Sequence, residues 1–149
     1  MDLHGRVRAF LEQTLGAMGL PLDIVIADAA DSVRVDLSGT GGETLLHRRG
    51  ETLDALQHLV NTAYRRELDG ERSFVVDCLG YRRGKDAELQ QMARFSMEKA
   101  KSSGTPQEIG PLNPYARRLV HITVAEDAQL TSESIGDAFL NTVIISLRR

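Results

Sequence analysis

Residues 22–38 read LDIVIADAADSVRVDLS and predict two short strands joined by a turn. The first seven residues are rich in branched apolar side chains, as strands usually are. The last six alternate, so that Val33, Val35 and Leu37 fall on one side and polar residues on the other. This period of two is typical of a half-buried strand, and the pair is expected to form a hairpin.

One helix is predicted before this hairpin in the sequence and another after it. Residues 3–18 and residues 51–68 carry apolar side chains at three- and four-residue spacing, which is typical of amphipathic helices. Residues 73–79 (SFVVDCL) are mostly apolar and predict a third, buried strand. The first half of the chain therefore has the predicted order α-β-β-α-β.

The second half predicts a different order, α-β-α-β-β. Its expected elements are a helix over 85–101, a short extended piece over 105–109, a helix from 114 to about 125, and strands over 129–135 and 142–147. The fold class is therefore predicted as α/β of the α+β kind, with two small modules at 1–79 and 80–149.

The composition is that of a globular protein with a modest negative charge. The 149 residues carry a net charge of −3 with a pI of about 5.8, whereas nucleic-acid-binding proteins are usually basic. Residues 1–79 hold 8 basic and 13 acidic side chains, and residues 80–149 hold 10 and 8. Since phosphate contact depends on local charge, the second half is expected to contribute more to any such contact.

Targeting and redox features point to the cytoplasm. No apolar run approaches the roughly 20 residues that cross a bilayer, so no membrane insertion is expected. The N-terminus shows no secretory signal. Cys78 is the single cysteine, which excludes an internal disulfide.

A first candidate binding segment is the sequence HRRG at residues 47–50, directly before a predicted helix. His47 opens the segment, Arg48 and Arg49 offer forked donors that fit phosphate oxygens, and Gly50 leads into the helix. Helix N-termini also carry a partial positive charge. On spacing alone, the alternative of a solvated turn with two exposed arginines is favoured.

A second candidate segment is NPYARRLVH at residues 113–121. An asparagine N-cap followed by proline at the first helical position predicts that a helix starts here. Arg117 and His121 are four residues apart and therefore share a helix face. Leu119 and Ile122 are expected to point toward the core.

The polar edge of that helix offers several groups to a nucleic acid. Arg118 lies beside the shared face, Tyr115 can stack on a base near the helix start, and Asn113 stands at the start itself. His121 can donate to a phosphate or ribose oxygen, best when protonated. The alternative is that Arg117 pairs with a nearby carboxylate and His121 is an ordinary surface residue, which spacing alone favours.

A third segment, GYRRGK at residues 80–85, opens the second half. Arg82 and Lys85 suit phosphate contact, and they equally suit a solvated helix start.

Enzymatic chemistry finds little support. The four histidines have no metal-ligand spacing, and no nucleophile elbow, phosphate-binding loop or dinucleotide fingerprint occurs. Cys78 lies in an apolar strand, where cysteine usually acts as a small hydrophobic residue. We therefore expect no catalytic residues, no metal site and no cofactor.

Taken in register, three segments resemble the Jag family of bacterial RNA-binding proteins over nearly the whole chain. Residues 113–121 fit the family's Asn-Pro-x-x-Arg-Arg-x-x-His pattern. Residues 49–57 (RGETLDALQ) resemble the family's KH loop and the helix that follows it. Residues 79–82 (LGYR) are similar to the start of the family's second domain.

This resemblance implies a KH domain of the prokaryotic type followed by a domain named for its Arg-x-x-x-His motif. KH domains pack helices on one face of a three-stranded sheet, and their Gly-x-x-Gly loop clamps four nucleotides. The second domain is then a small sheet with two helices, whose arginine and histidine face single-stranded nucleic acid.

The chain departs from the family in two places. His47 stands where the KH loop has its first glycine, which lets the backbone approach nucleic acid closely. Residues 137–141 (DAFLN) lack the proline and arginine of the family's acidic-x-Pro-x-Arg stretch, so one expected phosphate contact is missing.

The sequence thus predicts a non-enzymatic protein that binds single-stranded RNA, or single-stranded DNA, through backbone contacts with little sequence preference. The alternative is a protein-interaction adaptor, in which the KH unit has lost its glycine clamp and docks a second copy of this chain or another KH protein.

Overall fold

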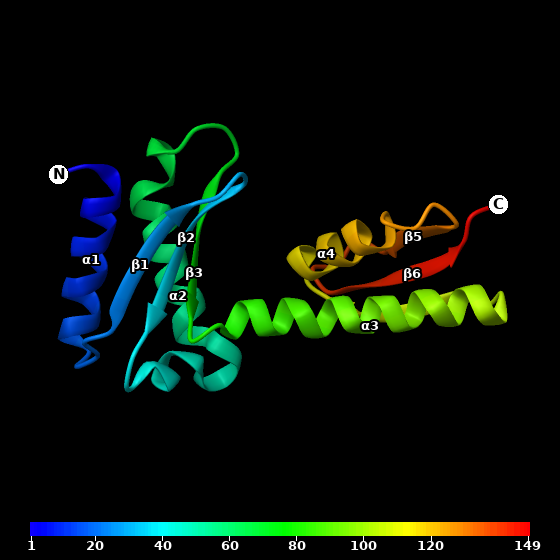
Figure 1. Ribbon diagram of the computed structural model, residues 1–149, viewed down its shortest axis with the longest axis horizontal. Coiled ribbons are helices and arrows are strands. Elements are labelled where there is room, and N and C mark those ends of the chain that lie inside the picture. Colours follow the sequence, from blue (N-terminus) through cyan, green and yellow to red (C-terminus); the bar gives the residue numbers. More distant parts are fainter. The chain divides into compact units, whose positions relative to one another are not determined.

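The computed structural model describes residues 1–149 and contains two compact units, Met1–Arg83 and Gly84–Arg149 (Figure 1). Each unit has one three-stranded sheet and its own hydrophobic core. The predicted α+β class with two small sheets is confirmed. No helix is both long enough and apolar enough to span a membrane.

The first unit follows the predicted order of elements. They are α1 (Leu3–Ala17), β1 (Asp23–Asp28), β2 (Ser32–Ser38), the 3-10 turn η1 (Gly42–Leu46), α2 (His47–Tyr64), the 3-10 turn η2 (Arg65–Glu67) and β3 (Ser73–Cys78). The sheet order is β1-β2-β3, with β1 antiparallel and β3 parallel to β2. The predicted hairpin is therefore confirmed.

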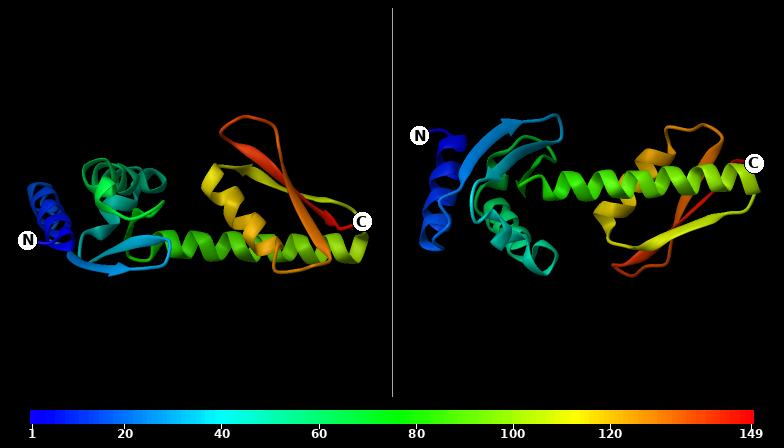
Figure 2. Two further views of the ribbon diagram at one scale, coloured as in Figure 1. Left: turned by 90° about the horizontal axis from the view of Figure 1, so that it is seen from above. Right: turned by 60° about the horizontal axis from the view of Figure 1, so that its bottom comes forward.

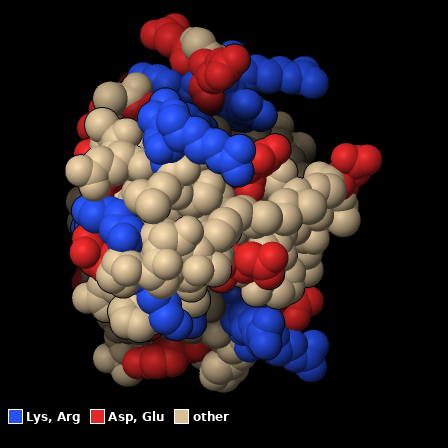
Figure 3. Space-filling model, turned by 90° about the vertical axis from the view of Figure 1, so that its right-hand side faces the viewer, with Lys and Arg blue, Asp and Glu red and all other residues tan.

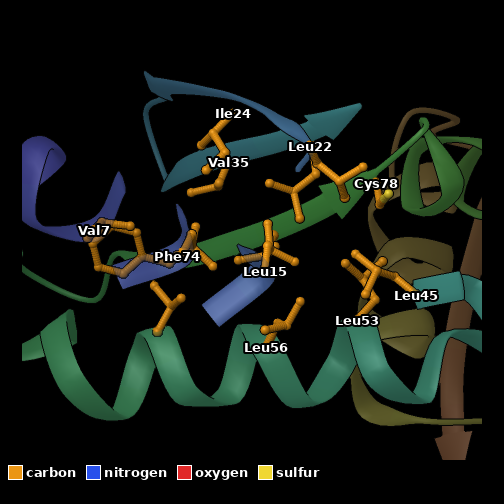
Figure 4. Packing of buried hydrophobic residues seen from close by; sticks show 14 of the residues in the cluster. Val7, Leu15, Leu22, Ile24, Val35, Leu45, Leu53, Leu56, Phe74 and Cys78 are labelled. Carbon is orange, nitrogen blue, oxygen red and sulfur yellow. The ribbon is translucent and has the colours of Figure 1, made fainter. Parts of the chain in front are cut away.

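One apolar cluster joins this sheet to both helices (Figure 4). Val33, Val35 and Leu37 are buried, as their alternation predicted. Side chains of α1 and α2 pack against them, and the fully buried Phe74 of β3 is the largest buried side chain of the chain. Cys78 is also buried here.

The outer edge of β3 is closed by two amide side chains of α2. Asn61 accepts the N–H of Phe74 at 2.8 Å through Oδ1 and donates to the carbonyl of Phe74 at 2.9 Å through Nδ2. One turn earlier, Gln57 Oε1 accepts the N–H of Val76 at 2.9 Å. These bonds replace the strand neighbour that an edge strand lacks.

We expect Asn61→Ala to lower the free energy of unfolding by about 1–3 kcal/mol, because both backbone groups of Phe74 lose their partner. Urea denaturation measures this change. His58→Ala, an exposed residue of the same helix, is the matched control and should leave stability within about 0.5 kcal/mol. Equal effects of the two variants would show that the amide does not close the strand.

The second unit contains two helices and an antiparallel sheet. Its elements are α3 (Tyr81–Ser103), β4 (Gln107–Leu112), α4 (Pro114–Val124), β5 (Leu130–Ile135) and β6 (Asn141–Leu147), and the sheet order is β4-β6-β5. The core residues are Ala93, Met97, Ala100, Ile109, Val120, Val124, Leu130, Val143 and Ile145.

Two details of the helices differ from the prediction. Helix α3 begins at Tyr81, four residues early, because the carboxylate of Asp77 accepts the N–H groups of Arg82 and Arg83 at 2.8 and 3.3 Å. Ile122 is half exposed, so the expectation that it faces the core is wrong. At 100° per residue it lies opposite Val120, which is on the buried side of α4.

Candidate nucleic-acid interface

The segment at residues 47–50 is a left-handed turn in front of α2. Arg48, Arg49 and Gly50 have φ angles of 53°, 60° and 77°, so the regular helix starts at Glu51 as predicted. A left-handed backbone costs a non-glycine residue about 1–2 kcal/mol. Two neighbouring arginines in this conformation suggest a functional turn, since such strain gathers at binding sites.

The side chains of this turn face solvent. His47 and Arg49 are exposed and have no hydrogen bond or ion pair within the chain. Arg48 lies 3.9 Å from the exposed carboxylate of Glu51, a weak surface pair. The turn therefore presents an unpaired guanidinium beside a helix N-terminus, where anions are favoured.

Gly50 is needed for two reasons. Its φ of 77° lies in the region that favours glycine, and an added Cβ would lie 3.0 Å from Cε1 of Tyr81. The buried glycine thus lets the turn pack against the start of α3.

We expect Gly50→Ala to lower the free energy of unfolding by at least about 1 kcal/mol, through backbone strain and the contact with Tyr81. Gly84→Ala is the control, because Gly84 is helical and its added Cβ meets nothing within 4 Å. It should raise stability by about 0.5–1 kcal/mol. Thermal or urea unfolding measures the stability of both variants. A stabilising Gly50→Ala would contradict the conclusion that this position needs a glycine.

The start of α4 is capped as the sequence predicts. Oδ1 of Asn113 accepts the N–H of Ala116 at 2.8 Å, and Pro114 occupies the first turn. The carbonyl oxygen of the Asn113 side chain is therefore used in the cap. Tyr115 follows with an exposed ring, and its hydroxyl donates to Asp86 at 2.7 Å.

Arg117 is half buried and is not paired with a carboxylate. Its Nη1 donates to the backbone oxygens of Leu112 at 3.1 Å and Phe139 at 2.9 Å. Its Nε and Nη2 groups make no hydrogen bond within the chain. Arg118 beside it is exposed and has no ion pair. The two arginines together leave several N–H donors available to a ligand.

His121 is held between two serines of β5. Nδ1 lies 2.7 Å from Oγ of Ser132, and Nε2 lies 2.8 Å from Oγ of Ser134. Burial, and secondarily the charge of Arg117, lower the pKa of His121 below its ordinary value. The lowered pKa favours the uncharged imidazole at neutral pH, and the two serine contacts link α4 to β5.

This depressed pKa has a measurable effect on stability. Between the pKa of folded His121 and its ordinary value near 6.5, the unfolded chain binds more protons, so the stability contributed by neutral His121 is lost as pH falls through this window. We expect His121→Gln to show a smaller loss than the wild type in urea denaturation from pH 7.5 to 5. An NMR titration of His121 above pH 6.5 would refute the shift.

In the third segment, residues 80–85, the basic side chains contact other groups of the protein. Nη1 of Arg82 bonds to Asp54 at 2.8 Å, and its Nε bonds to the backbone oxygen of Val76 at 2.7 Å. Lys85 lies 3.8 Å from Glu88. The remaining nitrogen of Arg82, Nη2, is buried, so Arg82 is a poor candidate for phosphate contact.

Sequence reasoning missed two features of these regions. The first is the fully buried Asp77, which lies 3.5 Å from Arg34 and caps α3. The sequence signal for this role was that Asp77 is a lone aspartate in an apolar strand. The second is the turn between β5 and β6, where Phe139 and Leu140 stand exposed in a polar segment.

Cysteine reactivity and metal binding have little support in the structure. Burial raises the pKa of the Cys78 thiol to about 11, so it is protonated at neutral pH. No group of three or more histidine, cysteine, aspartate or glutamate side chains is placed to hold a metal ion. On the face shown in Figure 3, basic and acidic side chains are interspersed around a broad uncharged area.

Comparisons with known proteins give consistent results. Residues 87–146 match the model of the R-three-H domain, which is the domain named for its Arg-x-x-x-His motif. The chain is 30% identical to RNA-binding protein KhpB of Clostridium symbiosum over 149 residues, which covers 99% of this chain and 67% of the relative. It is 23% identical to RNA-binding protein KhpB of Bacillus subtilis, covering 100% of this chain and 73% of that relative.

Proposed function

The chain belongs to the family of the bacterial proteins named RNA-binding protein KhpB, and from this premise we propose that it binds single-stranded RNA and is not an enzyme. The observation that carries the proposal is the contrast among its arginines. Arg49 and Arg118 are exposed without an acidic partner, each within a segment that resembles a family motif.

Several other arginines of the two units are paired with carboxylates. The paired arginines are Arg6, Arg34, Arg48, Arg72, Arg82, Arg83 and Arg94. A guanidinium that is already paired offers less to a phosphate. Arg49 and Arg118, with the free donors of Arg117, are therefore the proposed phosphate contacts, and Tyr115 adds an exposed ring beside them.

We further propose that residues 1–79 form a KH domain whose turn at 47–50 approaches the RNA backbone. The helix-sheet order and the left-handed turn before α2 support this. His47, which replaces the first glycine of the family pattern, has an ordinary extended backbone with φ −61° and ψ 151°. No glycine is required there, and the exposed imidazole adds a donor rather than an obstruction.

Residues 80–149 are then the Arg-x-x-x-His domain. Contacts to phosphate carry little sequence information, so we expect weak sequence preference and strong salt dependence. The excess of acidic groups in residues 1–79 limits the affinity of that half. The adaptor alternative is not favoured, because both relatives are named for RNA binding.

We expect Arg49→Ala with Arg118→Ala to weaken binding of a fluorescent single-stranded RNA in an anisotropy titration at low salt. A plot of the logarithm of the binding constant against the logarithm of the salt concentration has a negative slope. Each lost phosphate contact should make this slope shallower by about 0.7. Arg66→Ala with Arg148→Ala removes the same charge from exposed, unpaired arginines, one in each unit, and serves as the control.

The control variant should retain most of the wild-type salt slope. If the wild-type chain fails to bind single-stranded RNA at low salt, the proposed function is wrong. If both double variants lose the same slope, the interaction is a general charge effect and the assigned contacts are wrong.

A further inference from the structure

The turn between β5 and β6 carries a conspicuous apolar side chain. Residues 136–140 read GDAFL, and the ring of Phe139 is 72% exposed, the highest value for an aromatic residue of this chain. Leu140 beside it is 53% exposed. Neither belongs to the core of the second unit. Two adjacent apolar side chains are therefore exposed on this turn and available to a ligand.

Hydrogen bonds fix the backbone of this turn. Nδ2 of Asn141 donates to the carbonyl oxygens of Gly136 at 3.1 Å and Ala138 at 2.6 Å. Nη1 of Arg117 donates to the carbonyl oxygen of Phe139 itself at 2.9 Å. The backbone that carries the ring is therefore ordered before any ligand arrives, which lowers the entropic cost of binding.

The same bonds place the turn beside the start of α4 (Figure 2). One nitrogen of Arg117 reaches both Leu112, just before α4, and Phe139. Tyr115, in the first turn of α4, is a second exposed aromatic residue. The unpaired Nε and Nη2 donors of Arg117 belong to the same region, and Asp137 is the one carboxylate of the turn.

We propose that Phe139 stacks on an unstacked base of single-stranded RNA, and that Arg117 is a positioning residue that fixes the turn carrying this ring. The inference rests on the proposed function and assigns a base contact to it. Sites for single strands combine cations for the backbone with aromatic rings for the bases, and every base offers a flat face. A guanidinium bonded to the backbone of an exposed ring meets both requirements.

The test compares Phe139→Ala and Phe139→Trp with Phe95→Ala, using anisotropy titrations with single-stranded RNA. Phe95 lies on α3 of the same unit and is 69% exposed, so it is a matched control. We expect Phe139→Ala to weaken binding about 5- to 150-fold, the range for losing one stacked base. Phe139→Trp should retain binding, and Phe95→Ala should have no effect.

Two further measurements separate stacking from phosphate contact. Phe139→Ala should leave the salt slope unchanged, because no phosphate contact is removed. With an oligonucleotide whose bases are replaced by abasic sites, wild type and Phe139→Ala should bind equally. If the wild type binds RNA and Phe139→Ala binds as tightly, the stacking proposal fails while the proposed function stands. If the wild type does not bind RNA, both fail.

The positioning role of Arg117 is tested by a double-mutant cycle, with circular dichroism confirming that each variant is folded. Without the Arg117 side chain, the turn loses its tie to α4, so Phe139→Ala should cost less in the Arg117→Ala background than in the wild type. Equal costs in the two backgrounds would show that Arg117 does not position the ring.

Discussion

A single guanidinium nitrogen, Nη1 of Arg117, joins two parts of the second unit that lie far apart in the sequence, the second of them 22 residues from the arginine. It bonds to the backbone in front of α4 and to the backbone of the turn between β5 and β6. His121, one turn further along α4, is fixed to Ser132 and Ser134 of β5. The arginine and histidine of the family motif thus hold α4 against the sheet of the second unit.

The negative net charge of the chain bears on how it can bind RNA, which is a polyanion. The net charge of −3 is unfavourable, but charge matters locally, and several arginines are already paired with carboxylates. Exposed arginines without such partners, Arg49 and Arg118 among them, keep their full attraction for phosphate. The uncharged imidazole of His121 adds no positive charge, so its contribution is geometric. Under the proposed function, phosphate contact falls to the exposed arginines without acidic partners, and the proposed stacking on an aromatic ring gains in relative importance.

The parts of the fold that depend on neighbouring residues were predictable from the sequence. The alternation around Val33 identified a strand, and the asparagine-proline pair identified the start of α4. The errors came from hydrogen-bond partners that residue spacing does not reveal. Helix α3 begins early because Asp77 accepts its first N–H groups, and Arg82 is occupied because Asp54, 28 residues away in the sequence, lies beside it. For the same reason, spacing placed Arg117 and His121 on one face and gave no sign of the carbonyl and serine partners that hold them.

The turn at residues 47–50 has a left-handed backbone at three successive positions. The backbone of His47 lies outside the left-handed region, so its dihedral angles do not require a glycine. The left-handed positions are Arg48, Arg49 and Gly50, and a Cβ added at Gly50 would lie 3.0 Å from Cε1 of Tyr81. The chain therefore tolerates strain of about 1–2 kcal/mol at each arginine. Strain of this size in two exposed arginines serves no packing purpose, which favours a role for their backbone and side chains in binding.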